Sequence, residues 1–247
     1  MSSPRSALLP LLAAVGLLAA PPARAQMCDD SPFACEVDLA IEAGLQFYRT
    51  LENGTGHLGD QQGRHNFLGV LTFLEKRAGL GFLGRQLGFV GLDPVDQNMV
   101  VRLVRKLIES EGVMTNPNAT PYTYVAGGNL MALSAYLATG GPDDVGAMVT
   151  ATQALANGVV GLQRTQGNQG PNNIGGWNYN NPTASGDLST TQFGVAGLSA
   201  AENILEGASM NLPNVINFLM VDQNDQNGGL SYNPNSEPSS SMTASGL

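Results

Sequence analysis

Apolar side chains along this chain recur mainly at the spacing of one helix face. In the first such segment they fall at steps of three and four, at Val37, Ile41, Leu45, Tyr48 and Leu51. The same period returns around residues 100–108, 148–162 and 213–220. No segment shows the strict alternation typical of a half-buried strand, so the pattern predicts an all-α protein.

A second kind of helix is predicted after each of these four segments, beyond a polar loop rich in Gly and Asn. These second segments, such as residues 127–141 and 189–207, contain many small residues and are apolar on most sides. The units align on one leucine each, at Leu71, Leu133, Leu198 and Leu247. Repeated two-helix units are typical of a helical array in which neighbours bury one another's apolar faces. We therefore expect the small-residue helices inside and the amphipathic helices outside.

Two of the loops share a phrase. GGWNYNNPTASGDLSTTQFGVAGL spans residues 175–198, and GGLSYNPNSEPSSSMTASGL spans residues 228–247. The glycine pair in each copy permits a tight turn, and Trp177 predicts a large plug whose N–H needs a partner. The residues expected to hold this turn are Gln169, Gly175, Gly176, Trp177, Gln223, Gly228 and Gly229.

This phrase resembles that of the prenyltransferase and squalene-cyclase repeat superfamily, in which a glutamine precedes G-x-W by a few residues. The resemblance covers residues 150–247 and is only architectural over residues 36–140. It implies an α/α toroid, an inner ring of helices within an outer ring, made of about six hairpins. The chain supplies about four of them, so we expect a partial toroid and a fragment of a longer protein. The resemblance implies that Gln169, Gly175 and Trp177 fasten neighbouring hairpins together.

The first 25 residues have the organisation of a secretory signal peptide. Arg5 supplies a positive charge, residues 7–20 are almost wholly apolar, and Ala23-Arg24-Ala25 is a cleavage site. The apolar run is too short for a membrane span, and no later run is longer, so no stable membrane insertion is expected. The chain thus divides into a signal peptide over 1–25, an N-terminal segment over 26–35 and a toroid domain over 36–247. We expect a bacterial-type exported protein, periplasmic or extracellular.

Both cysteines, Cys28 and Cys35, follow the predicted cleavage site. In an oxidising compartment they are expected to form a disulfide that staples the N-terminal segment. A redox or metal role is the alternative, and the absence of a C-x-x-C spacing disfavours the redox role.

The charge of the chain excludes two classes of partner. Removal of Arg5 and Arg24 with the signal leaves nine basic and 20 acidic residues, and takes the formal charge from −9 to −11. Such a chain has no basic patch to neutralise phosphates. Nucleic acid and anionic membranes are therefore not expected as partners.

No catalytic signature is evident. Cyclases of the resembling superfamily that start by protonation use a D-x-D-D acid, and neither Pro142-Asp143-Asp144 nor residues 222–225 match it. The two aspartates after Pro142 suit the start of a helix instead. Its protein prenyltransferases hold zinc with Asp, Cys and His. Here His57, Asp60 and His65 share one loop, but nothing fixes their geometry. We expect no metal site and no cofactor.

Two further sets of residues have local interpretations. Ser189-Thr-Thr-Gln192 predicts a capping box, with Ser189 as the N-cap and Gln192 at the third helical position. The aromatic residues of the repeated loops, Trp177, Tyr179 and Tyr232, are candidate ligand contacts.

These features favour an exported toroid repeat protein that is non-catalytic and binds an unidentified ligand or protein partner. One alternative is an isoprenoid cyclase- or prenyltransferase-like enzyme whose catalytic residues lie outside this fragment. A second alternative is a polysaccharide-acting toroid enzyme, suggested by export and by the Asn-, Tyr- and Trp-rich loops. Both enzyme readings rest on likeness of fold, which does not establish function.

Overall fold

The structure is a computed structural model that describes residues 32–52, 54–59, 64–78, 85–167, 175–180, 184–234 and 236–246. The predicted signal peptide, Cys28 and Gln169 lie outside these residues. The described chain is mostly helical, which confirms the all-α prediction. Over this part of the chain, no helix is long and apolar enough to cross a membrane.

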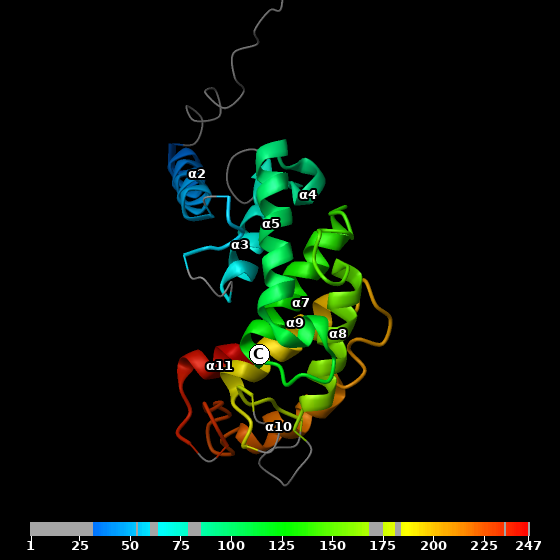
Figure 1. Ribbon diagram of the computed structural model, residues 1–247. Helices are drawn as coiled ribbons and strands as arrows, with labels where there is room; N and C mark the ends of the chain where they lie inside the picture. Colours follow the sequence, from blue (N-terminus) through cyan, green and yellow to red (C-terminus); the bar gives the residue numbers. More distant parts are fainter. Residues whose placement is uncertain are drawn as a thin grey trace, which may run out of the picture.

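Four helical hairpins follow one another in the predicted order (Figure 1). Their first helices are α2 (Pro32–Glu52), α5 (Pro94–Ser110), α8 (Ala151–Thr165) and α10 (Val215–Asp222). Their second helices are α3 (Asn66–Leu74), α7 (Thr123–Ala138), α9 (Leu188–Ala201) and α11 (Ser240–Gly246). The connections contain β1 (Arg77–Ala78), β2 (Arg85–Gln86), α4 (Gly88–Gly91), α6 (Gly112–Thr115) and η2 (Leu212–Asn214). We number the hairpins one to four along the chain.

Local sequence explains where two of the first helices begin. Pro94 opens α5, and the Asp93 carboxylate accepts hydrogen bonds from the first free amides of that helix. Thr150 precedes α8, and its hydroxyl accepts a hydrogen bond from the Gln153 amide. In contrast, α2 begins within the segment 26–35 that was predicted to precede the helical domain.

The small-residue helices form an inner row, as predicted. α7 packs between α3 and α9, and α11 packs against α9. Glycine makes the approach of α7 and α9 possible, because a Cβ on Gly197 would lie 2.7 Å from the carbonyl oxygen of Gly127. α5 packs across α3 and α7, and α8 packs across α7 and α9. These two amphipathic helices therefore form an outer layer.

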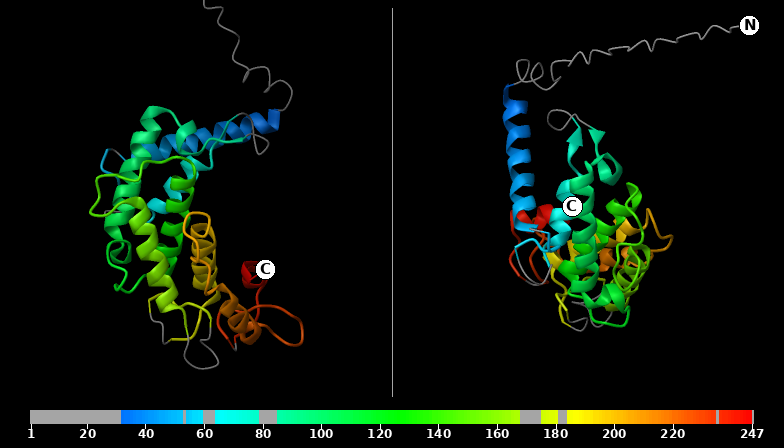
Figure 2. Two further views of the ribbon diagram at one scale, coloured as in Figure 1. Left: turned by 90° about the vertical axis from the view of Figure 1, so that its right-hand side faces the viewer. Right: turned by 45° about the horizontal axis from the view of Figure 1, so that its top comes forward.

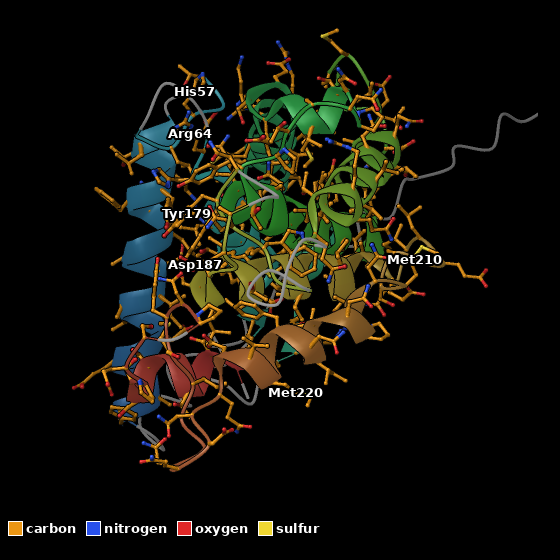
Figure 3. The ribbon with its side chains drawn as sticks, turned by 90° about the horizontal axis from the view of Figure 1, so that it is seen from below. His57, Arg64, Tyr179, Asp187, Met210 and Met220 are labelled. Atoms are coloured by element: carbon orange, nitrogen blue, oxygen red, sulfur yellow. The ribbon has the colours of Figure 1, made fainter. Side chains whose placement is uncertain are left out.

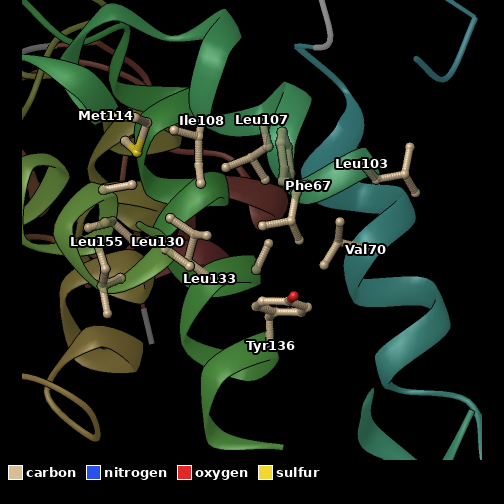
Figure 4. Close-up of a cluster of buried hydrophobic side chains, with 14 of the residues drawn as sticks. Phe67, Val70, Leu103, Leu107, Ile108, Met114, Leu130, Leu133, Tyr136 and Leu155 are labelled. Atoms are coloured by element: carbon tan, nitrogen blue, oxygen red, sulfur yellow. The ribbon is translucent and has the colours of Figure 1, made fainter. Parts of the chain in front are cut away.

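One continuous apolar core joins hairpins one to three (Figure 4). Side chains from α3, α5, α7 and α8 meet in it, among them Phe67, Val70, Leu103, Leu107, Ile108, Leu130, Leu133, Tyr136 and Leu155. A smaller cluster of Leu188, Phe218 and Leu230 joins the start of α9 to hairpin four. The last hairpin is thus attached both through this cluster and through Val215 of α10, which belongs to the main core.

The hairpins follow a curved path. Figure 2 shows α2 at one end of an open arc and α11 at the other, with α7 and α8 between them. The part of the chain that the structure describes therefore forms an arc of hairpins and not a closed ring.

Two buried carboxylates fasten α2 to α5. Asp96, which is 1% exposed, accepts hydrogen bonds from Nε and Nη2 of Arg49 at 2.7 and 2.6 Å. Glu52 is equally buried and accepts hydrogen bonds from Arg102 at 2.9 and 2.8 Å. Burial raises the pKa of Glu52, but Arg102 and two backbone amides together outweigh burial and lower this pKa. Cys35, in the first turns of α2, is disulfide-bonded.

Candidate ligand-binding site

The two copies of the repeated phrase form the same hydrogen-bonded turn. In hairpin three, Nε2 of Gln166 donates to the carbonyl oxygen of Gly175 at 2.7 Å. In hairpin four, Nε2 of Gln223 donates to the carbonyl oxygen of Gly228 at 3.0 Å. Both glycines have positive φ, 90° and 71°. Gln166 therefore holds the turn in hairpin three, and the predicted Gln169 lies outside the described residues.

A threonine of the inner helix closes each turn. The Trp177 amide donates to Oγ1 of Thr191 at 3.0 Å, and the Leu230 amide donates to Oγ1 of Thr243 at 2.9 Å. These threonines occupy the same position of the inner helix, the fourth residue of α9 and of α11. The sequence repeat is thus also a repeat of hydrogen bonds.

Trp177 fills the space behind the turn and is not a ligand contact in this structure. Its side chain is fully buried, and Nε1 donates to the carbonyl oxygen of Leu162 at 2.9 Å. A Cβ on Gly194 of α9 would lie 2.9 Å from the indole ring. Trp177 therefore joins α8 to α9, and Leu230 fills the equivalent place in hairpin four.

The predicted capping box at Ser189 and Gln192 does not form. Helix α9 begins at Leu188, and its N-cap is Asp187, whose side chain accepts a hydrogen bond from the Thr190 amide at 3.0 Å. The Ser189 hydroxyl instead donates to Asp187 at 2.8 Å. Asp187 precedes Ser189 in the chain, and its carboxylate accepts the hydrogen bond of the free amide. Because α9 begins at Leu188, Gln192 lies beyond the third helical position that a capping box requires.

Main-chain bonds place the loop tyrosines at the ends of the inner helices. The amide of Thr123, the first residue of α7, donates to the carbonyl oxygen of Tyr179 at 2.7 Å. The amide of Leu188, the first residue of α9, donates to the carbonyl oxygen of Tyr232 at 2.9 Å. Each tyrosine loop therefore satisfies a free N-terminal amide of the preceding inner helix.

Four tyrosines gather at these helix ends, and we call them the tyrosine ledge: Tyr122, Tyr124, Tyr179 and Tyr232. The ring centroid of Tyr179 lies 5.7 Å from that of Tyr122 and 6.4 Å from that of Tyr124. The hydroxyl oxygens of Tyr179 and Tyr232 lie 2.7 Å apart. Tyr122 is 40% exposed and Tyr232 is 38% exposed, so the ledge presents ring surface and hydroxyls to solvent.

Polar side chains beside the ledge form hydrogen bonds with it and with each other. Ser189 lies within hydrogen-bond distance of the Tyr232 hydroxyl, and it also contacts the buried Asp187 carboxylate. The Ser189 hydrogen bond lowers the pKa of Tyr232, but the Tyr179 hydroxyl, burial and Asp187 outweigh it and raise this pKa. Burial likewise raises the pKa of Tyr124. Both hydroxyls stay protonated at neutral pH and can donate hydrogen bonds.

Tyr179 of the ledge lies toward one side of the molecule (Figure 3). Figure 3 shows Tyr179 and Asp187 on the same side as His57 and Arg64, with Met210 on the opposite side.

Of the three candidate zinc ligands His57, Asp60 and His65, Asp60 lies outside the described chain. Within the described ranges, no three His, Cys, Asp or Glu side chains gather closely enough to hold a metal ion.

Asp143 and Asp144 do not stand at the start of a helix as expected, because α8 begins at Ala151 with Thr150 as its N-cap. Asp143 accepts a hydrogen bond from the Thr152 amide, in the first turn of α8, at 2.7 Å. Asp144 accepts a hydrogen bond from the Gly146 amide in the preceding turn. Both side chains thus serve local backbone structure.

Compared with protein-family models, with curated proteins and with solved structures, the chain matches none. The interpretation of the site therefore rests on its geometry.

Gly175→Ala is expected to lower the free energy of unfolding by about 2–3 kcal/mol, because φ is positive and a Cβ would collide with the carbonyl group of Asn214. Gly228→Ala is the matched control, because its φ is also positive but its Cβ would meet only open space and Gln223 at 3.8 Å. It should cost about 1 kcal/mol. Urea unfolding of both variants measures the difference, and equal losses would contradict the role of Asn214.

Asp222 makes stability depend on pH. It is 2% exposed, Oδ2 has no hydrogen-bond partner, and burial raises its pKa to about 6. As pH rises from about 4 to 6, the unfolded chain releases this proton while the folded chain retains it, so stability falls. Asp222→Asn should remove this loss and raise the unfolding free energy at pH 8 by about 2–3 kcal/mol. Thermal unfolding at pH 4 and pH 8 tests it, and an unchanged pH dependence would refute it.

Proposed function

We propose that the mature chain is an exported, non-catalytic binding module built as part of an α/α toroid, and that its ligand contacts the tyrosine ledge. The resemblance to the prenyltransferase and squalene-cyclase repeat superfamily and the curved row of hairpins support the toroid. The observation that carries the binding role is the pairing of Tyr179 and Tyr232. They occupy equivalent positions of the repeat, are partly exposed, and their hydroxyls lie 2.7 Å apart.

A ledge of this kind is prearranged for binding. The main chain of Tyr179 and of Tyr232 is held by a hydrogen bond to a buried inner helix. Tyrosine has few rotatable bonds, a large apolar face and a polar tip, so it offers contact area with little loss of conformational freedom. Prearranged contacts of this kind strengthen binding because the side chains lose less conformational entropy when the ligand binds.

The test compares immobilised wild-type protein from residue 26 with the Tyr179→Ala/Tyr232→Ala variant. The probes are soluble neutral polysaccharides, polygalacturonate, a lysine-rich peptide and farnesyl diphosphate. We expect wild-type protein to bind at least one probe class, and the double variant to bind that class at least about tenfold more weakly. Phe33→Ala is the control, because Phe33 is an exposed aromatic residue of α2 in hairpin one, whereas the ledge tyrosines belong to hairpins two to four.

Equal binding by the wild-type protein and the ledge variant would contradict the proposed site. Consumption of farnesyl diphosphate by the purified wild-type protein would contradict the non-catalytic role and support the isoprenoid enzyme alternative. Circular dichroism of all variants shows whether a loss of binding reflects a loss of fold.

A further inference from the structure

We infer that the ligand of the tyrosine ledge is a neutral polysaccharide that lies across three consecutive hairpins. This inference rests on the proposed binding function and names its ligand class. The argument has three steps: the ledge repeats along the fold, its chemistry fits a sugar ring, and its charges disfavour the other extended ligands.

The ledge repeats with the hairpins. Tyr179 and Tyr232 each follow the glycine pair of their hairpin by three residues, and Tyr122 and Tyr124 lie at the start of the inner helix of hairpin two. Three successive hairpins therefore each present at least one tyrosine on the side of the inner row where the inner helices begin. A surface that repeats along a fold suits a ligand that repeats along its own length.

The chemistry of the ledge matches that of a sugar ring. A pyranose has an apolar C–H face and a rim of hydroxyl groups, so it needs an apolar platform with hydrogen-bonding groups beside it. The ledge offers partly exposed phenol rings, with Tyr124 supported by Phe193 at a centroid distance of 3.9 Å. The paired hydroxyls of Tyr179 and Tyr232 can both donate and accept hydrogen bonds at the edge of these rings.

The charges near the ledge disfavour charged polymers. The mature chain carries a formal charge of −11, and Asp187 and Glu111 lie close to the ledge tyrosines, so a polyanion would be repelled. The positive charge of Arg64 favours the ionised form of Glu111 and so opposes the effect of burial on the pKa of this carboxyl group. A cationic polymer would gain little from Asp187, because this carboxylate is 2% exposed and already accepts hydrogen bonds from Ser189 and the Thr190 amide.

The experiment is affinity electrophoresis of the mature protein in gels that contain hydroxyethylcellulose, a mannan, polygalacturonate or chitosan, followed by calorimetry with oligosaccharides of the retarding polymer. We expect retardation by a neutral polymer. Tyr179→Ala and Tyr232→Ala should each weaken binding at least about tenfold, Tyr232→Phe should weaken it about threefold, and Phe33→Ala should leave it unchanged. A hexasaccharide should bind at least about tenfold more tightly than a disaccharide, because it contacts more than one hairpin.

Stronger retardation by polygalacturonate or chitosan than by the neutral polymers would overturn the inference, as would neutral-polymer binding that the ledge variants do not alter. Ledge-dependent binding of farnesyl diphosphate or the lysine-rich peptide in place of a polysaccharide would overturn this inference and leave the proposed binding function intact. Absence of ledge-dependent binding to every probe would overturn both.

Discussion

Trp177→Ala is expected to lower the free energy of unfolding by about 3–5 kcal/mol, because it removes the largest fully buried side chain and leaves a cavity between α8 and α9. The carbonyl oxygen of Leu162 also loses its partner, which adds to the cost. Urea unfolding followed by far-UV circular dichroism measures the change, since the variant lacks the single tryptophan of the chain.

Trp177→Leu is the matched comparison, because hairpin four carries Leu230 at this position. Leucine fills part of the space and should recover about half of the lost stability. A loss below about 1 kcal/mol for Trp177→Ala would show that hairpin three does not depend on this plug.

Arg49→Met is expected to cost about 3–5 kcal/mol, because it leaves the buried Asp96 carboxylate without the guanidinium that bonds both of its oxygens. Replacing both partners, in Arg49→Met/Asp96→Leu, should recover most of this stability, since no unpaired charge is then buried. Thermal and urea unfolding of the single and double variants give the interaction free energy of the pair.

Arg105→Met is the control for this pair. Arg105 contacts Glu109 one turn along α5, and its side chain is 49% exposed. An exposed pair of this kind contributes less than about 1 kcal/mol, so the control should be nearly as stable as the wild-type protein. Equal losses for Arg49→Met and Arg105→Met would contradict the importance of burial.

The order of the helices could be predicted from the sequence because burial imposes a period on the chain. The outer helix α5 shows a clear apolar face, and the inner helices α7 and α9 contain the small residues that close packing requires. Trp177 was correctly expected to need a partner for its N–H, since a buried indole rarely leaves this group unsatisfied. The order of the helices and the need of Trp177 for a hydrogen-bond acceptor both depend on residue composition and spacing, which are visible in the sequence.

Choices between neighbouring residues of one type could not be predicted. Gln166 lies nine residues before Gly175, and only the geometry of the turn shows that its side chain reaches this glycine. Asp187 and Ser189 are both good N-caps, so the start of α9 was placed too late. Such choices depend on differences of about 1 kcal/mol between local arrangements, which spacing alone does not resolve.

Half of the tyrosine ledge was also missed. Tyr179 and Tyr232 were found through the repeated phrase, whereas Tyr122 and Tyr124 belong to a loop without the glycine pair. Tyr122 and Tyr124 flank the first residue of α7, whereas Tyr179 and Tyr232 lie nine and eight residues before the first residue of α9 and of α11, so neither the loop phrase nor the helix start aligns the two pairs.

The bond from each inner helix to the next tyrosine loop gives the array a direction of assembly. The Thr123 amide of α7 finds its acceptor, the carbonyl of Tyr179, only when the following hairpin is in place, and Leu188 likewise depends on Tyr232. Each newly folded hairpin therefore supplies the carbonyl oxygen that stabilises the start of the preceding inner helix. Synthesis from the N-terminus supplies the hairpins in this order, so the chain can fold one hairpin at a time.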